Sequence, residues 1–155
     1  MLVSKLNGYA IASQFLIDQF DSNSLVNTVI FGVPEAKDLN RTNIFPIVNI
    51  SPSTLMTSGN RLEIEFDIAV LDIRKIPNQL QTSKIFGDNL IDSLNTCSAI
   101  ITKEITKLDL QRNEFDIVLV SSTAARPIIF SEKNLLDGWE TTIVISIQNE
   151  IETLG

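Results

Sequence analysis

Residues 61–70 alternate between apolar and mainly polar side chains, and this pattern limits the fold more than any other feature of the chain. The apolar positions are Leu62, Ile64, Phe66, Ile68 and Val70, and the intervening positions are Arg61, Glu63, Glu65, Asp67 and Ala69. Successive side chains of a β-strand point to opposite faces of its sheet, so a repeat of two residues indicates a strand with one buried face. We therefore expect the first set in the core and the second set in water or against a partner.

Four further segments have the β-branched and aromatic composition of strands, namely residues 26–33, 45–50, 115–120 and 139–147. Apolar side chains at helical spacing predict helices over residues 1–20 and 78–107. The stretches 34–43 and 51–60 are polar or rich in Ser, Thr, Pro and Gly, so we expect surface loops there.

This order of elements predicts an α+β fold of two layers, in which two helices pack on one face of a mainly antiparallel five-stranded sheet. The chain has no internal repeat or visible domain boundary, so we expect a single domain over residues 1–155. The core should form between the apolar set of residues 61–70 and the stripe of the second helix, Leu90, Leu94, Cys97 and Ile101. In the last strand, the expected core face is Trp139, Thr141, Ile143, Ile145 and Ile147.

Charge and residue usage exclude several classes of function. The net charge is −7 and the 12 Lys and Arg residues are scattered, whereas binding to nucleic-acid phosphates needs clustered cations. The chain has no histidine, which removes the commonest general base and the commonest zinc ligand. Its apolar runs are too short to span a membrane and its first residues fit a secretory signal poorly. The single cysteine, Cys97, excludes an internal disulfide and suits a reducing compartment.

A few side chains are of types that could take part in catalysis or metal binding. Carboxylates on one strand face, Glu63, Glu65 and Asp67, are compatible with acid–base or metal chemistry, but their alternation favours a solvated or partner-facing surface. Cys97 lies on an apolar helical stripe without a histidine to activate it, which favours a buried inert thiol over a nucleophile. The run 121–123 (Ser-Ser-Thr) lacks the glycine-rich turn of a serine nucleophile, and Arg126-Pro127 is either a partner contact or a solvated loop. We therefore expect no catalytic, cofactor or metal residues.

Three segments together resemble a family of known proteins. They are the long strand of residues 60–72, the helical run IFGDNLID at 85–92, and the strand GWETTIVI at 138–145. Their layout is similar to that of the tail-terminator and tail-completion proteins of tailed bacteriophages, which include neck and head–tail joining proteins. Subunits of that family are small α/β domains that assemble into rings.

The resemblance implies a structural virion protein and not an enzyme. It implies a homo-oligomeric ring at the tail terminus or neck, which caps the tail and joins it to the head connector. Partners would be further copies and other tail, neck or connector proteins, and the chain would pass from the host cytoplasm into the virion. The long alternating strand and the stretches 34–43 and 51–60 would then be contact elements. Two alternatives stay open, first a small cytosolic interaction or adaptor domain, and then an enzyme that uses carboxylate or backbone groups.

Overall fold

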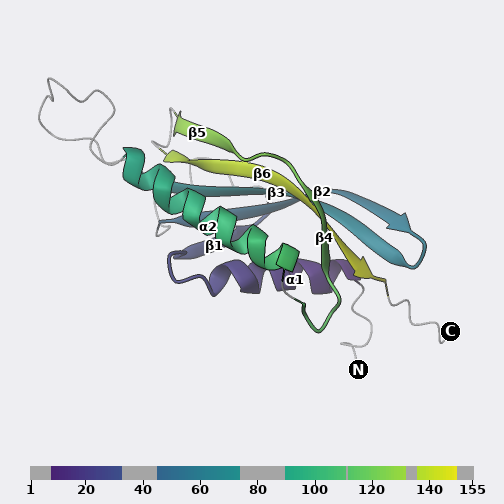
Figure 1. Cartoon of the computed structure of the whole chain (residues 1–155). Helices are drawn as coiled ribbons and strands as arrows, with labels where there is room; N and C mark the ends of the chain where they lie inside the picture. Colours follow the sequence, from purple (N-terminus) through teal and green to yellow (C-terminus); the bar gives the residue numbers. More distant parts are fainter. Residues whose placement is uncertain (1–7, 33–44, 74–89, 111, 132–135, 150–155) are drawn as a thin grey trace, which may run out of the picture.

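The computed structural model describes residues 8–32, 45–73, 90–110, 112–131 and 136–149 (Figure 1). Within these ranges the chain forms two α-helices and six β-strands. Their order is α1 (Gly8–Asp21), β1 (Thr28–Phe31), β2 (Ile47–Ser58), β3 (Arg61–Ile73), α2 (Leu90–Leu110), β4 (Val118–Ser122), β5 (Arg126–Ser131) and β6 (Leu136–Gln148). The fold is α+β, as predicted.

The described strands form one mixed sheet in the order β1-β2-β3-β6-β4, and β5 pairs with β6 beside β4. Strands β3 and β6 form the centre, with an antiparallel pairing from Arg61↔Gln148 to Ile73↔Leu136. Strand β1 runs parallel to β2, and all the other pairs are antiparallel. The prediction of a mainly antiparallel sheet is confirmed, but a sixth strand and one parallel pair correct its details.

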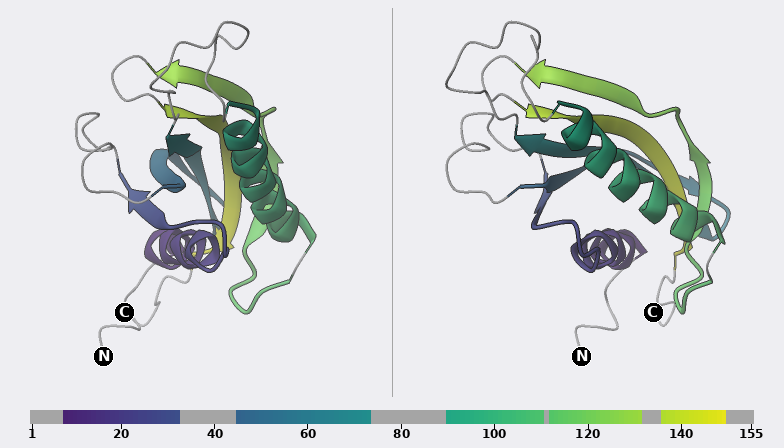
Figure 2. Two further views of the ribbon diagram at one scale, coloured as in Figure 1. Left: turned by 90° about the vertical axis from the view of Figure 1, so that its left-hand side faces the viewer. Right: turned by 60° about the vertical axis from the view of Figure 1, so that its left-hand side comes forward.

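Both helices lie on the same face of the sheet, which we call the core face, and the opposite face is called the open face (Figures 1 and 2). The alternation of residues 61–70 has the expected sense. Its core set is Leu62, Ile64, Phe66, Ile68 and Val70, each at most 5% exposed. Cys97 and Ile101 of α2 are buried against this set. Leu94 is half-buried and is not part of this core cluster, so its prediction is wrong, and the side chain of Leu90 lies outside the described residues.

A second, smaller apolar cluster lies on the open face, at the end of the sheet away from the β2–β3 turn. It consists of Ile47, Leu71 and Leu136, with Ile30, Phe45, Ile73 and Ile128 packed against it. Here β3 is buried on both faces, because Val70 and Leu71 are consecutive and both are covered. The simple alternation therefore ends at residue 70.

Two of the expected loops contain strand. Residues 51–58 are the outer part of β2, which turns at Gly59 (φ +64°) into β3, so the loop predicted over residues 51–60 is wrong. Strand β5 begins at Arg126-Pro127, where we expected a loop or partner contact, and Pro127 is tolerated because edge strands need not use every N–H. The other predicted loop, 34–43, lies outside the described residues.

The boundaries of the other elements differ from the predicted ones by a few residues where both can be compared. Helix α1 begins at Gly8 and α2 at Leu90, so the predicted starts at residues 1 and 78 lie outside the described residues. The strand predicted over 115–120 is β4, which begins at Val118 after a turn in which Asp116 has φ 54°.

Candidate functional site

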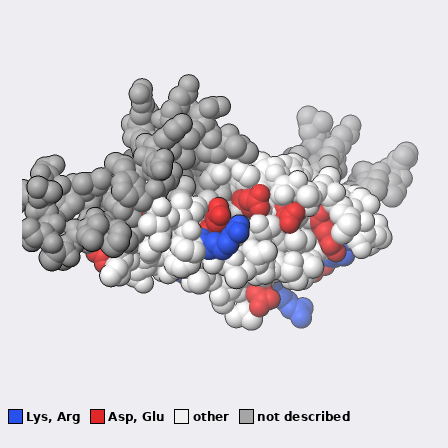
Figure 3. Space-filling model, turned by 90° about the horizontal axis from the view of Figure 1, so that it is seen from above, with Lys and Arg blue, Asp and Glu red and all other residues white. Residues whose placement is uncertain are grey.

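The carboxylates singled out in the sequence lie on the open face, which Figure 3 shows from above as a broken row of acidic side chains. Glu65 accepts hydrogen bonds from the hydroxyls of Ser53 (3.3 Å) and Thr54 (3.0 Å). Asp67 accepts a hydrogen bond of 2.7 Å from the hydroxyl of Thr142. In the part of the chain that the structure describes, no three Cys, Asp or Glu side chains are grouped to hold a metal ion. The open face is thus an acidic, hydrogen-bonded surface.

Cys97 is fully buried, and its Sγ lies 3.9 Å from the backbone oxygen of Asp137. Burial, together with the negative charges of Asp72 and Asp137, raises the pKa of this thiol from 9.0 to about 12, and burial is the largest cause. The thiol is therefore protonated at neutral pH and is a packing group, as the sequence indicated.

A pH dependence of stability follows from this pKa. The unfolded thiol loses its proton near pH 9, while the folded thiol keeps its proton up to about pH 12. The contribution of this thiol to the free energy of unfolding is fully present below pH 9 and is lost as the pH rises from 9 to about 12. Between pH 8 and 10 we expect the free energy of unfolding to fall by about 1 kcal/mol more than in Cys97→Ala. Urea unfolding of both proteins at the two pH values measures this, and parallel losses would contradict it.

The run 121–123 and Arg126 form structural contacts beside β6. The hydroxyl of Thr123 accepts a hydrogen bond from the backbone N–H of Thr142 (3.0 Å). The hydroxyl of Thr141 donates a hydrogen bond to the backbone oxygen of Thr123 (2.8 Å). Arg126 is exposed, and its guanidinium lies 3.6 Å from the carboxylate of Glu140, so the two form a weak surface ion pair. Ser121 and Ser122 are exposed on β4. These contacts bind the end of β4 to β6.

A buried carboxylate that the sequence analysis missed joins the two helices. Glu104 of α2 is fully buried, and its carboxylate accepts hydrogen bonds from the side-chain amides of Gln19 (2.9 Å) and Asn23 (2.7 Å). Lys107 lies 3.6 Å from the same carboxylate. The partners lie 85 and 81 residues away in sequence, so no local pattern could reveal them.

Replacing Glu104 with Gln should destabilise the fold by about 1–3 kcal/mol, because a side-chain amide has one acceptor oxygen where the carboxylate has two. Neither Gln19 nor Asn23 can rotate its side-chain amide toward the new glutamine without breaking another hydrogen bond. Gln19 also donates to the Glu104 backbone oxygen, and the Asn23 oxygen accepts the Leu25 N–H. Urea unfolding checks the value, with Lys107→Met as a control that removes only the ion pair. Equal stability of Glu104→Gln and the unmodified chain would show that the carboxylate is not needed.

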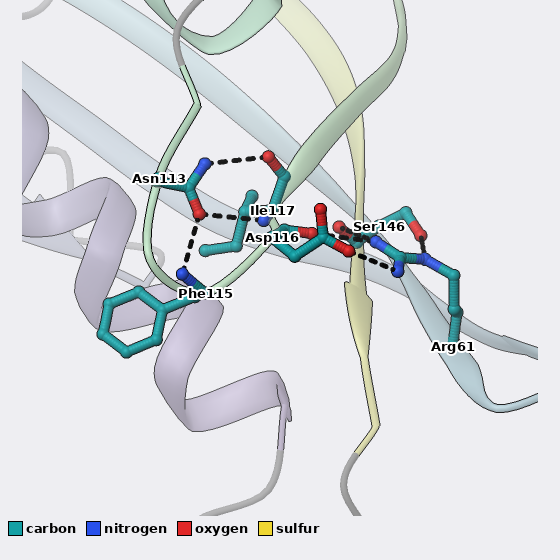
Figure 4. A network of polar contacts seen from close by, with 6 residues as sticks. All are labelled: Arg61, Asn113, Phe115, Asp116, Ile117 and Ser146. Carbon is teal, nitrogen blue, oxygen red and sulfur yellow. Dashed lines mark hydrogen bonds and ion pairs between the residues drawn. The ribbon is translucent and has the colours of Figure 1, made fainter.

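Arg61 fixes the turn before β4 to the central strands (Figure 4). Its guanidinium donates to the Ser146 hydroxyl (2.6 Å) and to the Asp116 backbone oxygen (2.9 Å), and it lies 3.1 Å from the Asp116 carboxylate. Within the turn, the Asn113 side-chain oxygen accepts the N–H groups of Phe115 (3.1 Å) and Ile117 (2.9 Å). These bonds hold the start of β4 in a fixed position beside β6.

Strand β4 is one open edge of the sheet. It pairs with β6 on one side only, and no described strand pairs with its other side. Its sequence, VLVSS, has no charge, and Val118 and Val120 are 47% and 49% exposed. Natural proteins usually protect such an edge with lysine, proline or a covering segment.

The outer arm of β2, residues 53–58, is the second open edge. Strand β1 pairs with β2 only at residues 47–50, so among the described strands the outer arm contacts β3 alone. Its sequence, STLMTS, is also uncharged, and Leu55 and Met56 are 59% and 57% exposed. The two open edges bound the same four-stranded part of the sheet, β2-β3-β6-β4.

A groove runs along β4 on the core face of the sheet, between this strand and α2. Its volume is about 300 Å³, and it is lined by Ile105, Thr106, Asp109 and Leu110 of α2 and by residues 119–122 of β4. Leu110 of this lining is 73% exposed. Apolar area here is therefore available to a side chain that arrives along the edge.

Comparison with known proteins gives no family for the chain. No protein-family model matches it, and no curated protein is significantly similar to it in sequence. No described helix has the length and apolar character needed to cross a membrane. The function is therefore inferred from the open edges and from the resemblance in layout.

Proposed function

We propose that this chain is a structural protein of a tailed bacteriophage virion. Copies of it form a ring at the tail terminus or neck, which caps the tail and joins it to the head connector. The observation that carries the proposal is the pair of uncharged open edges, β4 and the outer arm of β2, on opposite sides of one four-stranded segment. The layout that resembles tail-terminator and tail-completion proteins supports the position in the virion.

Two unlike edges favour a ring over a symmetric dimer. A contact between unlike patches repeats from copy to copy, and it closes into a ring when the rotation between neighbours divides a full turn. A twofold dimer would instead use one patch twice and leave the other edge exposed. The unlike edges of this sheet are therefore suited to a closed series of copies.

The charge of the chain supports a structural role around a genome. The net charge is −7, and the open face presents Glu63, Glu65, Asp67 and Glu140. A negative surface repels nucleic acid weakly, which suits a conduit that DNA must pass without being held. We propose no specific nucleic-acid binding for this protein.

The second candidate function is that of a small interaction or adaptor domain. The groove between α2 and β4 favours it, because extended peptides of partner proteins commonly add a strand to an open edge and place side chains in an adjoining groove. In that case the chain would bind a different protein as a monomer. The same edge is used in both candidates, so the identity of the added strand distinguishes them.

Gold labelling tests the proposed position. The tagged chain would be produced together with the proteins encoded by the flanking reading frames, and the particles would be examined by electron microscopy. We expect gold at the junction between tail and head, with several copies per particle. Particles without label, together with a monomeric chain that holds a peptide of another protein, would favour the adaptor and reject the virion role.

A further inference from the structure

The two open edges also fit each other. We propose that β4 of one copy pairs antiparallel with the outer arm of β2 in the next copy, and that Leu55 of the next copy enters the groove between β4 and α2. The inference rests on the proposed function, because it needs copies to assemble. It goes further by naming the contact surface and its occupant, a second copy of this chain.

Strand direction is the first reason. Strands β2, β3, β6 and β4 are antiparallel to their neighbours in turn, so β2 and β4 at the two ends run in opposite directions. If the sheet continues into the next copy with the same orientation, its β2 lies antiparallel to β4. In the part of the sheet that contains β4 and the outer arm, each copy then adds four strands in alternating directions. At the level of residues 138–140, β5 of the first copy and β1 of the next copy both lie between β6 and the next β2, so β6 and that β2 must be one strand spacing further apart there than beside β4.

The residues on the core face are the second reason. Leu55 pairs with Ile64, Ile64 with Ile145, and Ile145 with Leu119, so one apolar row crosses all four strands. Paired side chains lie on the same face of a sheet. Leu119 packs on the main core, whereas Leu55 at the other end of the row is 59% exposed. Pairing of the edges would place Leu55 of the next copy beside Leu119.

The groove offers Leu55 an apolar site in that position. Ile105 and Leu110 of α2 form one wall, and Leu119 and Val120 of β4 form the other. Leu110 and Val120, at 73% and 49% exposed, would both be covered by an entering leucine. Asp109 also lines the groove, but it is exposed and can stay in water. Burial of these three apolar side chains from water favours the contact.

The open face gives a matching second row. Met56 pairs with Glu63, Glu63 with Ser146, and Ser146 with Val118. Met56 and Val118, at 57% and 47% exposed, are thus apolar side chains at the two ends of the same row. Neither edge segment carries a charge, so pairing buries no ionised group. Both faces of the proposed contact therefore bring apolar side chains together.

Crosslinking between copies tests this pairing. In a Cys97→Ala background, Met56→Cys and Val118→Cys would be introduced together, and the assembled protein would be treated with a bismaleimide that reaches about 10 Å, or two strand spacings. Within one copy the two positions are three strand spacings apart, about 14 Å, so the reagent cannot join them. The matched control pair is Met56→Cys with Leu25→Cys, whose position is 46% exposed and lies between α1 and β1, in neither of the two edge segments.

We expect the double variant to give a ladder of covalent dimers, trimers and larger species, while each single variant and the control pair stay monomeric on a denaturing gel. Dimers from a single variant would mean that like edges pair, which overturns the head-to-tail contact. Assembly without a ladder would mean that copies associate through other surfaces, which would reject the pairing of the two edges but not the proposed ring. A chain that never assembles would reject the ring and the contact together.

A charged side chain at the edge provides a second measurement that does not depend on crosslinking. Leu55→Lys should raise the concentration needed for half-assembly about tenfold or more, because the lysine would have to be buried in the groove. Leu25→Lys, at a similarly exposed leucine outside the edges, should leave assembly unchanged. Circular dichroism of both variants confirms that they fold. Equal assembly of the two variants would contradict the role of Leu55.

Discussion

Replacing Gly138 with alanine is expected to destabilise the fold by about 3 kcal/mol or more. Gly138 lies on β6 opposite Leu71 of β3, at the centre of the sheet. A Cβ atom there would overlap the backbone oxygen of Val70 and would lie 2.8 Å from its carbonyl carbon and 2.9 Å from the Cα of Leu71. Backbone cannot move aside as a flexible side chain can, so β3 and β6 must separate locally.

Far-UV circular dichroism during urea unfolding measures this loss, since the neighbouring Trp139 could respond to the substitution directly. Glu140→Ala is the matched control on the same strand and face, and it should change stability by less than about 1 kcal/mol. If Gly138→Ala proved as stable as this control, the close approach of the two strands would be wrong.

Truncation of Phe66 to alanine should cost about 3–5 kcal/mol in free energy of unfolding. Phe66 is fully buried at the centre of β3, in register with the buried Ile143 of β6. It also contacts the ring of Phe31 edge-on, with 6.3 Å between the ring centroids. Removal of the ring leaves a cavity between sheet and helices that the surrounding backbone cannot close.

Phe31→Ala is the control for this prediction, because it removes the other ring of the same pair. Phe31 is 38% exposed, so its loss should cost clearly less, about 1–2 kcal/mol. The fluorescence of Trp139, the single tryptophan, follows unfolding of both variants. Similar losses in the two variants would mean that residues 61–70 do not place Phe66 at the centre of the core.

The central part of the fold could be predicted because its pattern is local. The alternation of residues 61–70 and the facing pattern of Trp139, Ile143 and Ile145 gave the correct buried faces. The helical stripe likewise placed Cys97 and Ile101 in the core. In each case, one element buries one face, so the burial of a side chain depends on its position within that element alone.

The outer arm of β2 and strand β5 could not be predicted, because their residues bury little within one copy. The outer arm of β2 has no apolar alternation, and its Ser and Thr residues, which follow Pro52, are typical of a loop. Strand β5 is short and begins with Arg126-Pro127. The need for glycine at 138 and the network at Glu104 depend on neighbours far away in sequence. Such features follow from tertiary contacts and leave no periodic signal.

Electron cryomicroscopy of the assembled protein shows whether copies of this chain join edge to edge into a ring. We expect a closed ring in which the density of β4 in one copy continues into the outer arm of β2 in the next, with the helices of every copy on the same side of the joined sheet. A monomer with an extended peptide of another protein on β4, and no neighbouring copy, would contradict it.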